Sequence, residues 1–197
     1  MVDKTPVRRR GLNREDGYSL PELLMVCVLI AIMGGMAAGV TLNYVNQSKS
    51  DGAVTSFISV LELTRNRAIS ERRNFEVTFT LPNRLIVQRV NVANGAVTDR
   101  TTVTDVRLDN TLVYKKFTGL PDTPDMFGAG APIDFDGTGP IAFTSDGSLV
   151  DQAGDPSNAT IFVGQNNNDS STARAITIMG ATGLIKKFTW GKTQWVG

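Results

Sequence analysis

Apolar and polar positions divide the chain into three zones with different periods. Residues 23–42 are almost all apolar, and no charged residue interrupts them. Across residues 43–74, apolar side chains recur every three or four positions, the spacing of one helical face. After Asn74 the period falls to two, which is typical of half-buried strands. The pattern predicts an α+β fold, in which a long N-terminal helix packs on an antiparallel β-sheet domain.

The second zone, residues 43–74, is predicted to be an amphipathic helix. Its apolar face is formed by Val54, Phe57, Ile58, Leu61 and Ala68. The opposite, solvent-facing side is expected to carry Glu62, Arg65, Arg72 and Arg73. Because glycine weakens a helix interior, we expect Asp51-Gly52 to loosen the helix near the start of this zone.

The third zone is predicted to hold eight short strands. They are expected at residues 75–81, 85–90, 103–108, 112–117, 141–144, 159–163, 173–179 and 184–190. Residues 82–84 and 180–183 are predicted to be tight turns. Residues 118–139 are rich in glycine, proline and aspartate, and they are expected to be mostly loop.

The first zone is long enough to cross a bilayer. Residues 23–42 read LLMVCVLIAIMGGMAAGVTL, and about 20 helical residues span the roughly 30 Å of a membrane's hydrocarbon core. A secretory signal peptide has a shorter apolar region, of about 7–15 residues, and is cut after it. Here the small residue Gly17 lies before the run, so we expect a cut at Gly17 and an apolar helix that stays in the mature protein.

The charges on either side of the apolar run predict its orientation. Residues 1–17 hold five basic and three acidic side chains, a net charge of +2. Cytoplasmic flanks of membrane helices are enriched in Lys and Arg. The N-terminus is therefore expected in the cytoplasm, with the chain beyond residue 43 across the membrane.

Glu22 is a carboxylate at the edge of this apolar helix. An interfacial glutamate that simply faces water is one interpretation, but carboxylates in such segments are functional by default. A cut after Gly17 would free an amino group on Tyr18, which is cationic near neutral pH. In a bundle of such helices, that amine can pair with Glu22 of a neighbour and so fix the axial register of the stack.

The octapeptide GYSLPELL, residues 17–24, resembles the class III signal of type IV pilins and type II secretion pseudopilins. The resemblance implies that a prepilin peptidase cuts after Gly17 and methylates Tyr18, where the family most often has phenylalanine. It also implies that Glu22 is the subunit-pairing residue. Four segments follow: a cleaved cytoplasmic leader at 1–17, a transmembrane and filament-core helix at 18–42, an amphipathic half-helix at 43–74 and a β-rich periplasmic domain at 75–197.

A narrower resemblance lies further along the chain. IAFTSDGS at residues 141–148 is similar to the Phe-x-x-x-Gly strand-turn of GspH/FimT-type pseudopilins and minor pilins, and residues 175–185 resemble their closing hairpin. Arg65-x-x-Ala68 also fits. The resemblance implies a minor pseudopilin of a type II secretion system, near the tip of a periplasmic pseudopilus. Its alternative is a FimT-like minor pilin in type IV pilus assembly or DNA uptake. An unrelated single-span membrane protein with a binding domain is the third interpretation.

The implied partners are those of filament assembly. They are the prepilin peptidase, other pilins or pseudopilins, an inner-membrane assembly platform and, before assembly, membrane lipid.

Composition argues against an enzyme. The 197 residues include no histidine and one cysteine, Cys27, so a Ser-His-Asp or Cys-His site and an intrachain disulfide are excluded. No acid/base pair of carboxylates and no phosphate-binding glycine loop stands out. We expect a structural subunit without cofactor or metal.

Two further segments carry candidate binding residues. Asp134-Phe135-Asp136-Gly137 has part of a calcium-loop pattern, to which Asp122 and Asp125 could add oxygens, but the closing glutamate is missing and a turn is favoured.

The last hairpin combines basic and aromatic residues, which are the ingredients of DNA contacts. These residues are Arg174, Lys186, Lys187, Lys192, Trp190 and Trp195. Strand alternation places the two adjacent lysines on opposite faces, and the net charge is only +1, so a solvated sheet face is favoured over DNA binding.

Overall fold

The computed structural model describes residues 17–91, 99–109 and 111–197, and for residues 37–43 it describes the backbone alone. The chain forms two compact units, Met1–Leu42 and Asn43–Gly197. The elements in chain order are α1 (Leu20–Glu71), β1 (Phe75–Thr80), β2 (Arg84–Val90), β3 (Arg100–Arg107), β4 (Leu112–Tyr114), β5 (Ile133–Phe135), β6 (Ile141–Phe143), β7 (Leu149–Val150), β8 (Ala159–Gln165), the short 3₁₀ helix η1 (Ser170–Thr172), β9 (Arg174–Met179), β10 (Leu184–Trp190) and β11 (Trp195–Val196).

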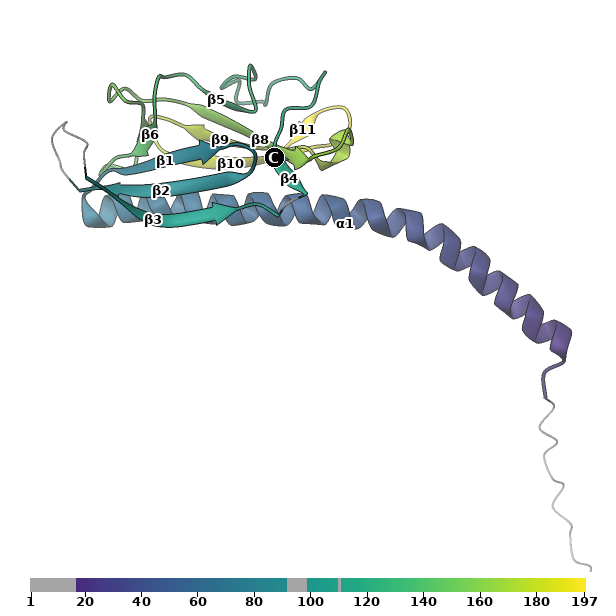
Figure 1. The fold of residues 1–197 in the computed structure, drawn as a ribbon. Coiled ribbons are helices and arrows are strands. Elements are labelled where there is room, and N and C mark those ends of the chain that lie inside the picture. The colour runs from purple at the N-terminus through teal and green to yellow at the C-terminus, as the bar shows by residue number, and fades with distance from the viewer. Residues whose placement is uncertain (1–16, 92–98, 110) are drawn as a thin grey trace, which may run out of the picture. The chain divides into compact units, whose positions relative to one another are not determined.

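The second unit is a helix packed on antiparallel strands, as the sequence predicted. The strands form two sheets rather than one. The first sheet has the order β3-β2-β1-β6-β7, and the second has the order β11-β10-β9-β8-β4, with β5 also paired to β8. Every pairing between these strands is antiparallel. Figure 1 shows both sheets on the same side of the C-terminal part of α1.

The predicted apolar face of the helix is confirmed. Val54, Phe57, Leu61 and Ala68 are fully buried, and Ile58 is partly buried against them. They share one core with strands of both sheets, such as Phe75 of β1 and Ile176 of β9. Burying a large apolar side chain stabilises the folded state by roughly 1.5–3 kcal/mol, so this face contributes much of the free energy that holds the helix against the sheets.

The helix ends with a recognisable C-terminal motif. Arg72 adopts a positive φ of 50°, and the N–H of Arg73 donates to the Ala68 carbonyl at 3.2 Å. A left-handed residue followed by such a backward bond satisfies carbonyls that the last helical turn leaves free. The chain therefore leaves the helix at Arg72 and enters β1 three residues later, at Phe75.

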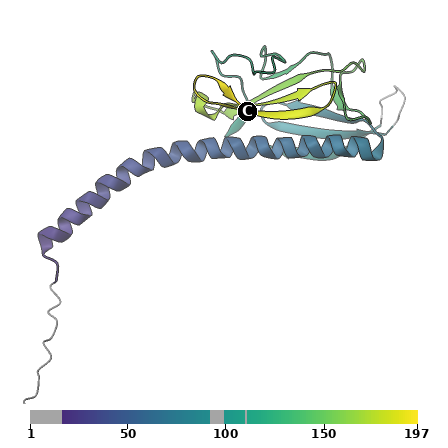
Figure 2. The same ribbon diagram turned by 180° about the vertical axis from the view of Figure 1, so that it is seen from behind.

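The predicted alternation of buried and less buried positions is seen in β4 and β6, whereas β8 and β9 are buried almost throughout. In the pairing of β2 with β3, the register changes between Val87 and Gln88, and Val103 is the extra residue on β3. A bulge lets Val103 and Val106 both pack against the core although three positions separate them. The final hairpin, β9 to β10, spans the predicted residues almost without error, and Figure 2 shows β10 beside α1 when the molecule is seen from behind.

The stretch 118–139 differs from its prediction as plain loop. It contains β5, which pairs with β8, and it contributes Leu120 and Ala129 to a second apolar cluster on the far face of the second sheet. All seven residues of β8 are buried as a result. A strand covered on both faces reads as a continuous apolar run, and the sequence alone does not show what covers it.

Candidate functional site

The predicted cleavage site lies immediately before α1. Gly17, Tyr18 and Ser19 are exposed and belong to no helix or strand, and the Tyr18 side chain is 82% exposed. Apart from its chain neighbours, none of the described residues has an atom within 4 Å of the position that a Cβ on Gly17 would occupy. The leader residues 1–16 lie outside the described part of the chain. Cleavage at Gly17 and methylation of Tyr18 stay predictions.

Glu22 lies in the first turn of α1, where it also has a local role. The Ser19 carbonyl accepts hydrogen bonds from the N–H groups of Glu22 at 3.0 Å and Leu23 at 3.1 Å. Pro21 suits this turn, because its missing N–H would have no helical partner there. A carboxylate in the first turn interacts favourably with the helix dipole. Pairing of Glu22 with a neighbouring subunit stays a prediction.

The first part of α1 exposes most of its apolar side chains. Those about half exposed or more are Leu20, Leu23, Leu24, Met25, Val26, Val28, Leu29, Ile30, Ile32, Met33 and Met36. Cys27 is exposed among them. A membrane-spanning helix was expected over residues 23–42, but the side chains of residues 37–42 lie outside the described part. Within the described residues, none of the helical segments is both long and apolar enough to span a bilayer.

An ion pair between Asp51 and a buried arginine, Arg174, ties the second part of α1 to the second sheet. Arg174 of β9 is 2% exposed, and its Nε and Nη2 donate to the two carboxylate oxygens of Asp51 at 2.8 and 3.0 Å. Its Nη1 donates to the carbonyls of Ser171 and Ala173, each at 2.9 Å. Lys187 of β10 adds a second cation 3.3 Å from Asp51.

This network lowers the pKa of Asp51, first through the hydrogen bond from Arg174, against the opposing effect of partial burial. α1 continues through Asp51 and Gly52, so these residues do not break the helix, and a local weakening at Gly52 stays a prediction. The Asp51 carboxylate attaches the helix to β9 through Arg174. The two residues are 123 positions apart, so helix periodicity does not reveal their pairing.

Arg65 makes a second attachment near the end of the helix. Its Nε donates to the Gly147 carbonyl at 3.0 Å, and its Nη2 donates to the Thr182 carbonyl at 2.9 Å. Gly147 lies in the turn between β6 and β7 of the first sheet, and Thr182 lies in the turn between β9 and β10 of the second sheet. The helical pattern predicts that Arg65 faces solvent, whereas the structure shows it half-buried between the two turns.

Two glycines make this close approach possible. Gly147 and Gly183 have positive φ angles of 86° and 63°. A Cβ on Gly183 would lie 2.0 Å from the Gly147 carbonyl oxygen and 2.7 Å from Nε of Arg65. The glycine-containing turns were visible in the sequence, and the arginine that joins them was not.

The candidate calcium segment acts as a set of turns. Asp134 accepts from the N–H of Gly130 at 2.6 Å, and Asp136 accepts from the Asn158 amide at 2.7 Å. Asp125 is paired with Lys186 at 2.7 Å. Among residues 17–91, 99–109 and 111–197, no group of three or more carboxylate, cysteine or histidine side chains is placed to hold a metal.

The basic and aromatic residues of the last hairpin do not form one patch. Arg174 is buried against Asp51, and Lys186 and Lys187 pair with carboxylates in different places, Asp125 and Asp51. Trp195 is buried, and its indole N–H donates to the Pro121 carbonyl at 3.0 Å. Trp190 and Lys192 line a shallow hollow of about 200 Å³. Arg174, Lys186 and Lys187 are thus engaged with carboxylates of the protein itself.

Comparisons with known proteins gave structural matches only. No family model matches the sequence, and no curated protein matches it. The minor pseudopilin EpsH from the type 2 secretion system of Vibrio cholerae is 14% identical, with 73% of this chain and 98% of that chain covered and a TM-score of 0.49. The type IV minor pilin FimU of Pseudomonas aeruginosa is 18% identical, with 80% and 96% covered and a TM-score of 0.46 in one crystal form.

Proposed function

We propose that this chain is a minor pseudopilin, a structural subunit of a type II secretion filament. The observation that carries the proposal is the order of features at the N-terminus. An accessible Gly17-Tyr18 bond is followed by Glu22 in a first helical turn and then by an apolar helical segment with exposed side chains. Such a segment requires a partner, either lipid or other helices, because large exposed apolar surfaces are unfavourable in water.

In this proposal the N-terminal segment has two successive environments. Before assembly it lies in the inner membrane, with the leader in the cytoplasm and the β-rich domain in the periplasm. A prepilin peptidase removes residues 1–17 and methylates Tyr18. An assembly platform in the membrane then adds the chain to a filament of related subunits, near its tip.

The charge at Glu22 sets the register of the added subunit. The new amino group of Tyr18 on one subunit pairs with Glu22 of its neighbour, and the pair is tolerated away from water because each charge is compensated. The Glu22→Leu variant is therefore expected to insert and be processed, but to be depleted from the filament fraction. Normal incorporation of this variant would contradict the pairing.

Type IV pilins carry the same N-terminal motif, so the phenotype of a deletion strain has to distinguish a type II secretion system from a type IV pilus. A deletion strain is compared with the same strain carrying a plasmid-borne copy, and the proteins exported by each are identified. Loss of specific exported proteins, restored by the plasmid, supports the pseudopilin assignment. An unchanged profile with loss of piliation or DNA uptake would overturn it in favour of a type IV minor pilin.

A further inference from the structure

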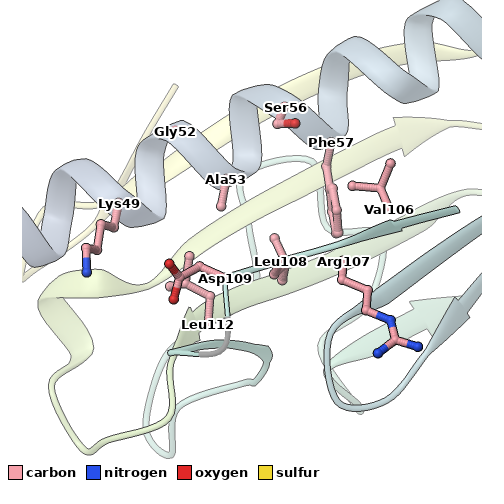
Figure 3. Close-up of a pocket in the computed structure, with 10 residues that line it drawn as sticks. All are labelled: Lys49, Gly52, Ala53, Ser56, Phe57, Val106, Arg107, Leu108, Asp109 and Leu112. Atoms are coloured by element: carbon pink, nitrogen blue, oxygen red, sulfur yellow. The ribbon is translucent and has the colours of Figure 1, made fainter.

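The two faces of the second sheet are covered in different ways. On one face α1 packs through apolar side chains, and Figure 3 shows Ala53 and Phe57 pointing from the helix toward the strands. On the other face the cover includes residues 120–127, a segment without helix or strand. Its contribution to the second apolar cluster is Leu120, whereas its Met126 side chain is 80% exposed. Residues 120–127 therefore gain little of their attachment from apolar burial.

Internal hydrogen bonds hold residues 120–127 together as a unit, which we call the strap. The Asp122 carboxylate accepts from the N–H groups of Thr123, at 2.6 Å, and Gly128, at 3.1 Å. The Met126 N–H donates to the Thr123 carbonyl at 2.9 Å, and Met126 adopts a positive φ of 57°. A non-glycine residue keeps such a strained conformation only where its surroundings fix it. The strap is therefore ordered within itself.

Glycines in the left-handed conformation bound the strap at both ends. Gly119 has a φ of 84°, and Gly128 has a φ of 107°. Hinges are a few positions that absorb large changes in φ and ψ, and glycine makes such changes without a steric penalty from a Cβ. The strap therefore has a hinge at each end about which it can move as one piece.

Side-chain hydrogen bonds attach the strap to the second sheet. One carboxylate oxygen of Asp125 accepts from the Thr177 hydroxyl of β9, and the other accepts from the Lys186 ammonium of β10, each at 2.7 Å. Thr177 is 1% exposed beneath this contact. The Pro121 carbonyl accepts from the indole N–H of Trp195 at 3.0 Å. Each of these bonds is exchanged for one to water when it breaks, so its net contribution is modest.

We propose that the strap lifts from the second sheet while the rest of the domain stays folded, and that Asp125 is its latch. Segments with few buried apolar contacts open locally at a lower free energy than global unfolding requires. Lifting uncovers Thr177 and the part of the second apolar cluster that Leu120 covers. Exposed apolar patches mark sites of protein interaction, so the latch controls access to such a surface. The inference does not depend on the proposed function.

The test is the labelling of a buried thiol in the folded full chain, purified in detergent and carrying Cys27→Ser. Thr177→Cys places a thiol beneath the strap, and the control Ala159→Cys places one in the fully buried core on the helix side of the same sheet. We expect a maleimide to modify the Thr177→Cys chain at least several-fold faster than the control. Adding Asp125→Asn should raise the first rate several-fold further and leave the second unchanged. Adding Asp105→Asn, which breaks an ion pair on the first sheet, should change neither rate.

A second measurement leaves Thr177 in place. The two tryptophans of the chain, Trp190 and Trp195, have ring centroids 5.3 Å apart, and the Trp195 indole contacts the Pro121 carbonyl of the strap. Acrylamide quenching of their fluorescence should therefore rise in Asp125→Asn and stay at the wild-type level in Asp105→Asn.

The outcomes separate the strap from its latch. Equal labelling of the Thr177→Cys and Ala159→Cys chains, or equal acceleration of both by Asp125→Asn, would show that the sheet is uncovered only by global unfolding and would overturn the strap. A labelling rate or a quenching that Asp125→Asn leaves unchanged would overturn the role of Asp125 as the latch.

Discussion

The two parts of α1 use apolar side chains in opposite ways. In residues 20–36 nearly every large side chain is exposed, whereas Val54, Phe57, Leu61 and Ala68 are fully buried against two sheets. The second part is also fixed by charged side chains, with Arg174 holding Asp51 and Arg65 holding turns of both sheets. The comparison teaches that the domain stabilises the second part within one chain, while the apolar side chains of the first part gain no such burial among the described residues.

The largest expected difference concerns matched truncations in the two parts. Phe57→Ala removes a fully buried ring, so we expect a loss of about 3–5 kcal/mol in the free energy of unfolding. Leu24 is 58% exposed, and Leu24→Ala should change the free energy by no more than about 0.5 kcal/mol. Denaturant unfolding followed by tryptophan fluorescence measures both. Equal effects would contradict the division of the helix.

A smaller loss is expected when the attachment at Asp51 is removed. Asp51→Asn leaves Arg174 buried without its counter-charge, and hydrogen bonds to charged groups contribute about 1.5–3 kcal/mol. The control is Asp105→Asn, which breaks a pair with Arg84 on the surface of the first sheet. Unfolding of the control should be much closer to wild type. A control that is as unstable as Asp51→Asn would show that burial of the arginine is not the cause.

Glycine replacements should separate the first part of α1 from the turns that hold its second part, by about the same or a slightly smaller free energy. Gly183→Ala places a Cβ against the Gly147 carbonyl in a left-handed residue, and such strain costs about 1–3 kcal/mol. Gly34→Ala meets nothing within 4 Å in the first part of α1 and should leave the domain's unfolding transition in place. The thermal midpoints of both variants measure the difference. A Gly183→Ala variant as stable as wild type would contradict the claim that the two turns pack too closely to admit a Cβ at this position.

The smallest effect is a pH dependence. The pKa of Asp51 is lowered by Arg174 in the folded chain, so the folded state holds this proton less tightly than the unfolded state. The stabilisation is present above the unfolded pKa, near 3.9, and is lost as pH falls through the lower folded pKa. Between pH 5 and 3, wild type should lose stability more steeply than Asp51→Asn. Parallel pH profiles of the two proteins would contradict this contribution.

The sequence carried the local features of the fold better than its long-range ones. The buried face around Phe57 and the bounds of β10, Leu184–Trp190, follow from spacing within one element. The division into two sheets does not, because alternation identifies the faces of a strand and not its neighbours. Alternation also does not predict β5, because its three residues form a strand only by pairing with β8.

The candidate site shows the same limit. The motif around Gly17 and Glu22 is contiguous and could be read directly. The attachments of Arg65 and Arg174 join residues that are 82 to 123 positions apart, and a charged residue on a helix face looks solvated until its partners are known.

The central claim is that the chain is processed before its apolar segment enters a filament. It is tested most directly by intact-mass and N-terminal analysis of the mature protein from membranes, beside the Gly17→Val variant. The account predicts a wild-type chain that begins at methylated Tyr18 and a variant that retains residues 1–17. A wild-type chain that keeps its leader, or a variant matured normally, would contradict it.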